Sequence, residues 1–434
     1  MKRFLAHIII EAKTPLKVGG GKNDLFYDAP VQRDFNDLPM ILGTSVAGIL
    51  RKAFEDSAGK DSANEIFGTK DERDPDKQQG SKLIISNALL LDEKGVVCEE
   101  LLLKKSEFLK HFDVLPIRDH VSINANGTAK DAGKFDEEVV LKGTRFKFSL
   151  ELEGSKEEFE KILNLLSDPT LRLGGGSSKG FGSLEILKIK WGEFEADRCS
   201  SSLNFNSDIF LDFDLKNEAN DKFLRYKLKI SPDDFFMFGS GFGDSEADQT
   251  PVLESIIDYE KKCLTEYKIL IPASSVKGAL SHRTAFHYNK LKEQFGEEAK
   301  VGNENEAVRE IFGYEKSKTE NGAKGKILLS DCFLNYDKEK DAKVFEHVSI
   351  DRLTGGAIDG ALFQEKAVAK RDQFTIEILL KKGACDDAKK AFERALKDVV
   401  CGRLPLGGAT TKGHGFFKGE AKKYGEGWIE NEKG

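Results

Sequence analysis

The strongest constraint in this sequence is that it contains one ordered series of motifs twice. The glycine-rich stretches "LRLGGGSSKGFG" (171–182) and "LPLGGATTKGHG" (404–415) place Lys179 and Lys412 233 residues apart. The other repeated pairs are "GTSVAGIL" (43–50) with "ASSVKGAL" (273–280), "EIFGT" (65–69) with "EIFGY" (310–314), "LIISNALL" (83–90) with "ILLSDCFL" (327–334), and "HVSIN" (120–124) with "HVSID" (347–351). Such self-similarity predicts two copies of one domain, which we place at residues 1–198 and 205–434.

The pattern of apolar residues predicts the elements of the first copy. We expect strands at 4–12, 82–91, 144–153 and 182–191, helices at 45–54 and 155–166, and a polar linker at 192–207. The second helix begins with a capping box of Ser155 and Glu158. The resulting β-α-β-β-α-β order predicts an α+β fold, with two tandem ferredoxin-like domains that resemble RNA-recognition motifs and carry inserted hairpins.

Composition and charge limit the classes of protein to consider. The 434 residues are 39% hydrophobic and carry a formal net charge of −7, which fits a globular chain of two or three domains. No apolar run approaches the roughly 18 residues of a membrane span, and the N-terminus lacks a signal-peptide pattern. We therefore expect a cytoplasmic protein with no membrane partner. The negative charge argues against a free-standing, nonspecific nucleic-acid binder but leaves room for a local basic groove.

The two glycine-rich loops differ from the known nucleotide-binding loops. Each lysine is followed by glycine rather than by the serine or threonine of a P-loop, and each loop precedes a strand rather than a helix, unlike a dinucleotide-binding loop. Backbone N–H groups of such a loop can hold a phosphodiester chain. The RNA-binding candidates are then Gly175, Ser178, Lys179 and Gly180 in the first copy, and Gly408, Thr411, Lys412 and Gly413 in the second. The alternative is a turn that only allows close helix packing; retention of the residue order in both copies favours phosphate contact.

The repeated helix starts provide further RNA-binding candidates. Hydroxyl groups near an expected N-cap and basic residues in the following turns favour an anion. These residues are Ser45, Arg51, Lys52, Ser275, Lys277 and Arg283. An ordinary capped helix with a solvated basic flank explains the same pattern and is compatible with phosphate contact.

Two polar excursions follow the matched "HVS" motifs, at 123–140 and 350–368. They predict β-hairpins with turns at Asn126-Gly127 and Gly355-Gly356. Such hairpins either grip a partner or are ordinary surface loops.

Acidic residues cluster after the first strand of each copy. They are Asp24, Asp28 and Asp34 in the first copy, and Asp244, Glu246 and Asp248 in the second. A carboxylate beside a phosphate chain can hold a divalent ion or orient a 2′-hydroxyl for in-line attack. A solvated acidic turn is the plainer interpretation of the same residues.

Taken together, the motifs resemble the RAMP superfamily subunits that form the backbone of type III CRISPR effector complexes. The resemblance rests on "VGGG…DAPVQRDFNDLPMILGTSVAGILR", on "HVSIDRLTGGA" and on the two glycine-rich loops, and it extends over both copies, as in tandem subunits of this family. It implies binding of crRNA through the loops and first helices, a hairpin wedged into the guide–target duplex, and other type III effector subunits as partners. The first-copy hairpin, "INANGTAKDAG", departs from the "DRLTGGA" pattern of the second.

The resemblance also implies catalysis. An aspartate after the first strand of such domains cuts the target RNA with a divalent metal, which we expect to be Mg²⁺. The family pattern D-x-P-V falls on Asp28, so Asp28 is the first catalytic and metal-binding candidate. In the second copy Asp248 is the counterpart and Asp244 a substitute, but one extra residue precedes the proline, so this copy is the weaker candidate.

Three alternatives to an RNA-guided endoribonuclease remain open. One is a structural crRNA-binding backbone without catalytic activity. Another is a guide-processing endoribonuclease with histidine as the general base; it is weaker because the matched His120 and His347 lie far in sequence from the glycine-rich loops. The third is a protein-interaction scaffold that binds no nucleic acid.

Overall fold

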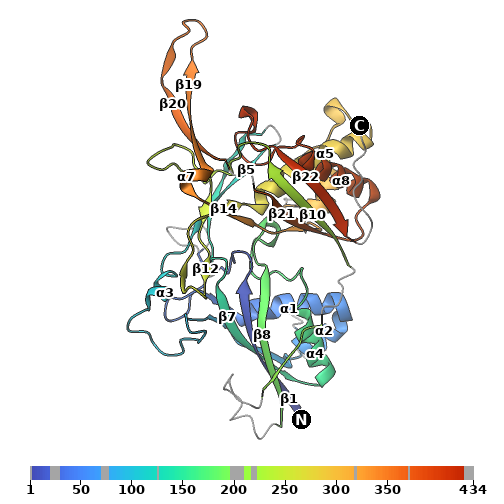
Figure 1. Ribbon diagram of the computed structural model, residues 1–434. Coiled ribbons are helices and arrows are strands. Elements are labelled where there is room, and N and C mark those ends of the chain that lie inside the picture. Colours follow the sequence, from blue (N-terminus) through green and yellow to red (C-terminus); the bar gives the residue numbers. More distant parts are fainter. Residues whose placement is uncertain are drawn as a thin grey trace.

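The computed structural model describes residues 2–19, 30–69, 78–124, 127–195, 210–216, 222–316, 320–369 and 372–424 (Figure 1). Each copy of the repeat forms a body built on an antiparallel sheet, with the first copy below the second in Figure 1. The predicted tandem α+β architecture is therefore confirmed. The domain limits 1–198 and 205–434 stay predictions, because 196–209 lie outside the described residues. Within the described ranges, no helix has the length and apolar character needed to cross a membrane.

The first copy is built on a sheet with the strand order β2-β4-β7-β1-β8-β9, in which β3 also pairs with β7. Its strands are β1 (Lys2–Ala12), β2 (Met40–Ile41), β3 (Leu83–Ile85), β4 (Ala88–Leu90), β7 (Arg145–Glu153), β8 (Leu184–Glu195) and β9 (Leu211–Asp212). Its helices are α1 (Gly43–Ala58), α2 (Lys60–Phe67), α3 (Glu107–Lys110), α4 (Lys156–Leu165) and the 3₁₀ turn η2 (Ser177–Lys179). The predicted hairpin is formed by β5 (Ile117–Ile123) and β6 (Ala129–Glu138).

The second copy contains a four-stranded sheet with the order β17-β21-β10-β22 and a three-stranded sheet with the order β11-β14-β18. The strands of these sheets are β10 (Phe223–Pro232), β11 (Leu253–Glu254), β14 (Lys268–Ile271), β17 (Ile327–Leu329), β18 (Cys332–Asn335), β21 (Phe374–Lys381) and β22 (Phe417–Tyr424). Its helices are α5 (Ala273–Leu291), α6 (Glu306–Phe312), α7 (Lys338–Asp341), α8 (Asp386–Val400) and the 3₁₀ turns η4 (Gly296–Glu298), η5 (Gly302–Glu304) and η6 (Thr410–Lys412). The two-stranded hairpins are β12 (Ile257–Asp258) with β13 (Cys263–Leu264), β15 (Gly313–Tyr314) with β16 (Ala323–Lys324), and β19 (Ala342–Ile350) with β20 (Ala357–Val368).

The central sheets of the two copies share one topology. Strand β1 lies antiparallel between β7 and β8, and β10 lies antiparallel between β21 and β22. The orders β3-β7-β1-β8 and β17-β21-β10-β22 are thus equivalent. This arrangement is the ferredoxin-like order expected from the sequence.

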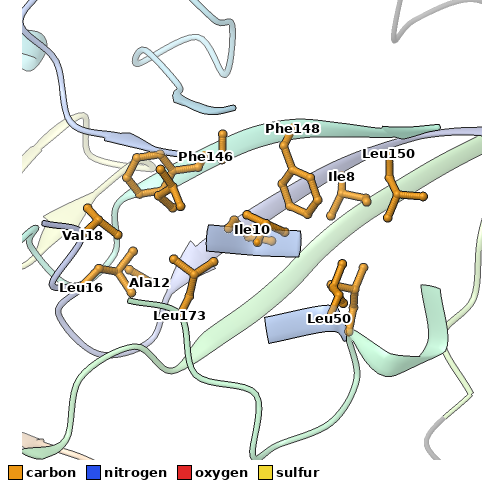
Figure 2. Close-up of a cluster of buried hydrophobic side chains, with 14 of the residues drawn as sticks. Ile8, Ile10, Ala12, Leu16, Val18, Leu50, Phe146, Phe148, Leu150 and Leu173 are labelled. Atoms are coloured by element: carbon orange, nitrogen blue, oxygen red, sulfur yellow. The ribbon is translucent and has the colours of Figure 1, made fainter. Parts of the chain in front are cut away.

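Alternating apolar residues build the core of each copy. In β7 every second residue is buried, and Phe146, Phe148 and Leu150 point toward the same layer as Ile8 and Ile10 of β1 (Figure 2). Leu50 of α1 closes this layer from the helical side. Period-two burial on one face of a sheet and a helix packed over it explain why these segments adopt the predicted elements.

Three predicted elements of the first copy differ in extent from the structure. The strand expected at 82–91 is divided into β3 and β4, because the intervening Asn87 uses its side chain to hold the start of α1. The linker expected from residue 192 begins later, since β8 pairs with β1 as far as Glu195. The helix expected at 45–54 is longer than predicted, and the unpredicted α2 follows it directly. The helix with the capping box of Ser155 and Glu158 is confirmed.

The two repeated helices are capped from a distance rather than by their own serines. The N-cap residues Leu42 and Pro272 provide no side-chain cap. Instead, the backbone N–H of Gly43 donates to Asn87 Oδ1 at 2.9 Å, and that of Ala273 donates to Asp331 Oδ1 at 2.8 Å. The second residue after β3 and the second residue after β17 thus satisfy equivalent donors in the two copies.

Candidate functional site

The two glycine-rich loops have the same backbone conformation. In each loop a 3₁₀ turn, η2 or η6, is enclosed by left-handed residues. These are Gly176 and Gly180, with φ of 69° and 107°, and Ala409 and Gly413, with φ of 53° and 92°. Positive φ favours glycine, so the glycines after Lys179 and Lys412 are needed to turn the chain back into the following strand.

Both loops are attached to the segment that follows the first strand of their copy. The N–H of Gly175 donates to the carbonyl of Lys17 at 2.8 Å, and the N–H of Gly408 donates to that of Met237 at 2.6 Å. The predicted loop glycines are thus used in part for anchoring. The Lys179 and Lys412 side chains then project from equivalent positions.

In the first copy the loop lysine belongs to a cluster that includes the hairpin. Lys179 Nζ lies 2.9 Å from Oε1 of Glu137, which is 3% exposed, and Lys17 Nζ lies 2.5 Å from the same atom. His120 Nε2 lies 3.4 Å from Glu137 Oε2, and its ring stacks on Phe135. Burial alone would raise the pKa of the Glu137 carboxyl, but the neighbouring His120 and the hydrogen bonds from Lys17 and Lys179 hold it well below its usual range.

The second copy contains the same cluster. Lys412 Nζ lies 2.5 Å from Oε2 of Glu365, which is fully buried, and His347 Nε2 lies 3.8 Å from that oxygen. The rings of His347 and Phe363 stack, and Lys412 lies over Phe363 at 4.6 Å. His414 takes the place of Lys17 as an additional neighbour, 3.4 Å from Glu365 Oε1.

We name each such cluster a latch: His120, Phe135, Glu137 and Lys179 in the first copy, and His347, Phe363, Glu365 and Lys412 in the second. Each latch joins the inserted hairpin to the glycine-rich loop, so the two predicted RNA-contacting parts form one unit. His120 and His347 lie far in sequence from the glycine-rich loops, as predicted, but the fold brings both of them to the latch. The repeated "F-x-E" of the hairpins was the signal for the missed glutamates.

The predicted helix residues are divided between structural and exposed positions. Arg51 donates to the carbonyl of Gly68 at 2.7 Å and thereby holds α1 to the end of α2. Arg283 forms an ion pair with Asp398 of α8. Lys52 is exposed and lies 3.3 Å from Asp56, whose hydrogen bond raises the pKa of the lysine. The exposed residues Ser45 and Ser275 lie in the first turns of α1 and α5.

The seam between the two copies collects cations. Here the first copy's glycine-rich loop meets the start of α5, and Lys277 of α5 faces Lys179 and Lys324. Burial lowers the pKa of Lys277, and the two neighbouring lysines lower it further. Burial also lowers the pKa of Lys324, with a further contribution from Arg172. In the described ranges, neither Lys277 nor Lys324 has a carboxylate within ion-pair distance.

Arg172 completes the seam. Its side chain is 9% exposed, its Nη2 donates to Ser330 Oγ at 3.0 Å, and its Nε and Nη1 have no hydrogen-bond partner among the described residues. Burial lowers the pKa of Arg172 to about 10. We use "seam cations" for Arg172, Lys179, Lys277 and Lys324. Mutually repelling, partly desolvated cations create a field that favours a polyanion.

The aspartate candidates lie at equivalent positions of the repeat. Asp28 lies outside the described residues, as does Asp24. The bridges Gly19–Val31 and Gly239–Pro251 match each other, and counting back three residues from Val31 and from Pro251 leads to Asp28 and Asp248. The insertion inferred before the proline thus shifts the proline rather than the aspartate.

Asp248 is exposed beside the hairpin of its copy. Its Oδ2 accepts the N–H of Gln364 at 2.8 Å, next to the latch residue Glu365. Its predicted substitute Asp244 is instead ion-paired with Lys366 at 2.5 Å. In the part of the chain that the structure describes, no group of three or more histidine, cysteine or carboxylate side chains is arranged to hold a metal ion.

Comparisons with known proteins agree with the two-copy architecture. The family model described as "RAMP superfamily" matches residues 9–185 and 258–418. No curated protein matches the sequence. One similar solved structure is described as "Cryo-EM structure of the Type III-B Cmr-beta bound to cognate target RNA". It shares 18% identity with a TM-score of 0.32, over 44% of this chain and 61% of that one, so this chain spans about three-fifths of that chain's length.

Proposed function

We propose, from the premise that this chain belongs to the RAMP superfamily, that it is a crRNA-binding backbone subunit of a type III CRISPR effector. In this proposal each copy holds one segment of the guide through its glycine-rich loop, and the guide selects the complementary target RNA by base pairing. The hairpins at the latches lie beside the guide. Neighbouring effector subunits continue the backbone on either side.

The observation that carries this proposal is the group of seam cations. A protein of net charge −7 here gathers three cationic side chains, Arg172, Lys277 and Lys324, without a carboxylate partner in the described ranges. Arg172 is buried and Lys277 is half-buried, whereas Lys324 is exposed beside them. Burying an unpaired charge is unfavourable, so a chain that keeps these cations close together gains most from an anionic ligand. Single-stranded RNA supplies a row of phosphates with the same charge and regular spacing.

RNA binding is tested by removing the seam charges. The variant Arg172→Ala/Lys277→Ala/Lys324→Ala is compared with Lys60→Ala/Lys94→Ala/Lys290→Ala, which changes three exposed lysines elsewhere and gives the same net charge. Three lost contacts at about 0.5 kcal/mol each weaken binding of a single-stranded RNA oligonucleotide by roughly tenfold. The slope of log K against log salt falls by about 2. Equal binding by both variants contradicts the proposal, and no binding by the wild type favours a protein scaffold.

Cleavage of the target RNA is the finer part of the proposal. We assign it to Asp28 and Asp248, with Mg²⁺ as the metal. Mg²⁺ commonly binds one or two carboxylates together with substrate phosphates and water, and the exposed carboxylate of Asp248 fits that mode. The ion would supply charge stabilisation to the scissile phosphate, while the latch keeps Gln364, the hydrogen-bond donor to Asp248, beside the glycine-rich loop.

The aspartates are tested in the assembled effector with labelled target RNA. Asp28→Ala removes one cut and Asp248→Ala removes a second, one backbone period away, while assembly and RNA binding are unchanged. Loss of only the first cut means that the second copy is inactive. If both variants leave the products unchanged, the chain is a structural backbone and another subunit cuts the target.

Guide processing is the second candidate, favoured by the position of His120 and His347 beside the loop lysines. Each histidine lies beside a buried glutamate, with Nε2–carboxylate distances of 3.4 Å for His120 and 3.8 Å for His347. His120→Asn and His347→Asn test it with labelled precursor RNA. Unchanged processing leaves both histidines with a role in the latches alone.

A further inference from the structure

The two copies are joined by a buried ionic contact that occurs once among the residues that the structure describes. Arg118 of β5 donates from Nε to Glu254 Oε2 at 2.9 Å, from Nη2 to Glu254 Oε1 at 3.1 Å and from Nη1 to Asp331 Oδ2 at 2.5 Å. All three side chains are at most 6% exposed. The hairpin of the first copy is therefore rooted in the second copy, and in Figure 1 strand β5 reaches into the upper body.

The reverse connection is a short hairpin that only the second copy contains. Leu253 lies 220 residues after its equivalent Arg33, whereas Ile269 lies 230 residues after its equivalent Pro39. The ten additional residues include β12 and β13, and we name residues 256–265 the clasp. In the first copy the same interval is a tight turn in which the N–H of Asp34 donates to the carbonyl of Leu38 at 2.8 Å.

The clasp packs onto the first copy. The N–H of Ile257 donates to the carbonyl of Lys142 at 2.9 Å. The hydroxyl of Tyr259 donates to the carbonyl of Leu91 at 2.7 Å, and the Arg145 guanidinium lies 4.7 Å from the Tyr259 ring centre. Ile257 and Tyr259 are members of the first copy's hydrophobic core, so the clasp is built into that copy rather than resting on its surface.

Each copy has an outer face, equivalent to the face that the other copy uses at the junction. The residues that form the junction are absent from these two outer faces, which we call the end faces. On the second copy's outer side, the strand pairings and loop register place Phe345, Pro405 and Gln373 at the positions of Arg118, Arg172 and Arg145. On the first copy's outer side, Asn87 and Asp34 occupy the positions of Asp331 and Glu254. The clasp has no counterpart there.

We infer that this type of interface forms only between the two copies within one chain. The chain does not join to further copies of itself through its two end faces. A head-to-tail interface that repeats generates an open filament. Here a second molecule would bring Phe345 toward Asn87 in place of the Arg118–Asp331 pair, without a clasp to hold it. Because the end faces lack the charges of Arg118 and Asp331, pairing between two molecules is disfavoured, and this gives the interface its specificity. The two ends are then left to proteins of different sequence.

The end faces themselves are open. Asn87 is exposed on the first copy, whereas its counterpart Asp331 is buried at the junction. A Cβ on Gly413 would meet no heavy atom within 4 Å, whereas one on Gly180 would lie 2.6 Å from Ala273 Cβ. This inference rests on the junction alone and holds whether or not the chain binds RNA.

The mass of the full chain in solution tests the inference. We expect sedimentation velocity to give the 48.3 kDa monomer over a hundredfold range of protein concentration. Two variants place tryptophan on the end faces, Ser45→Trp on the first copy and Thr411→Trp on the second. Association that either substitution abolishes means that the ends pair with each other and overturns the inference. A monomer, or association that neither substitution changes, supports it.

Discussion

The glycine-rich loops of the two copies have the same backbone and different neighbours. In the first copy Ser178 and Lys179 are half-buried and Gly180 is buried, because the second copy covers them. In the second copy Thr411, Lys412 and Gly413 are all exposed. The turn, its left-handed ends and its lysine–glutamate pair are nonetheless retained. Both copies therefore keep the loop conformation and the lysine–glutamate pair within each domain. They differ in the contacts that the loop makes across the junction.

The helix caps show the same division. Asn87 and Asp331 accept the first N–H of α1 and α5 with nearly equal geometry. An amide is sufficient for that bond, but only a carboxylate can also receive Arg118. One additional charge thus converts a local cap into part of an interface. Comparison of the copies therefore separates residues needed for folding from residues needed for assembly.

The largest expected effect comes from Arg118→Met, which breaks the junction on one side. It leaves the carboxylates of Glu254 and Asp331 buried without their partner, which costs about 3–5 kcal/mol. Urea unfolding followed by far-UV circular dichroism measures this loss. The control Lys227→Met removes the partner of the exposed Glu377, 2.8 Å away, and costs less than about 1 kcal/mol. Equal losses in the two variants contradict a junction that depends on the buried pair.

An intermediate effect comes from paired glycine substitutions. Gly413→Ala introduces a left-handed alanine in open space, at a cost of about 1–2 kcal/mol. Gly180→Ala carries the same backbone cost, and its Cβ would also lie 2.5 Å from Asp331 Oδ1. We therefore expect thermal unfolding to show a greater loss for Gly180→Ala. Equal shifts in the melting temperature mean that the seam opens freely to make room.

The repeat made much of the fold predictable from the sequence. A motif present twice, such as the glycine-rich loop with its lysine, shows which residues a domain retains, and the alternating residues of β7 specify a half-buried strand. The latches were missed because Glu137 and Lys179 are brought together only by the hairpin register. The repeated Phe135-x-Glu137 pattern, found again at Phe363-x-Glu365, was the available signal.

The junction could not be predicted by comparing the two copies in the sequence. Arg118 and the clasp each occur in one copy only, so comparison of the copies treats them as variation. Their meaning depends on partners 136 and 213 residues away in the chain, and no periodic pattern points to such pairs. The broken strand at Asn87 has the same origin, because a distant helix start uses that side chain.

The smallest expected effect is a change in pH dependence at the first latch. The pKa of Glu137 is lower in the folded chain than in the unfolded chain, where a glutamate titrates near pH 4.3. Ionised Glu137 therefore stabilises the fold above that pH, and this contribution is lost as the pH falls through the acid range. In Glu137→Gln the melting temperature should fall less steeply between pH 5 and pH 3 than in the wild type. Because the slope is compared, a uniform loss of stability in the variant does not interfere.

The control is Glu157→Gln, which changes an exposed glutamate in the first turn of α4 and should keep the wild-type slope. Parallel curves for all three proteins mean that the hairpin and the glycine-rich loop are not held together by this carboxylate.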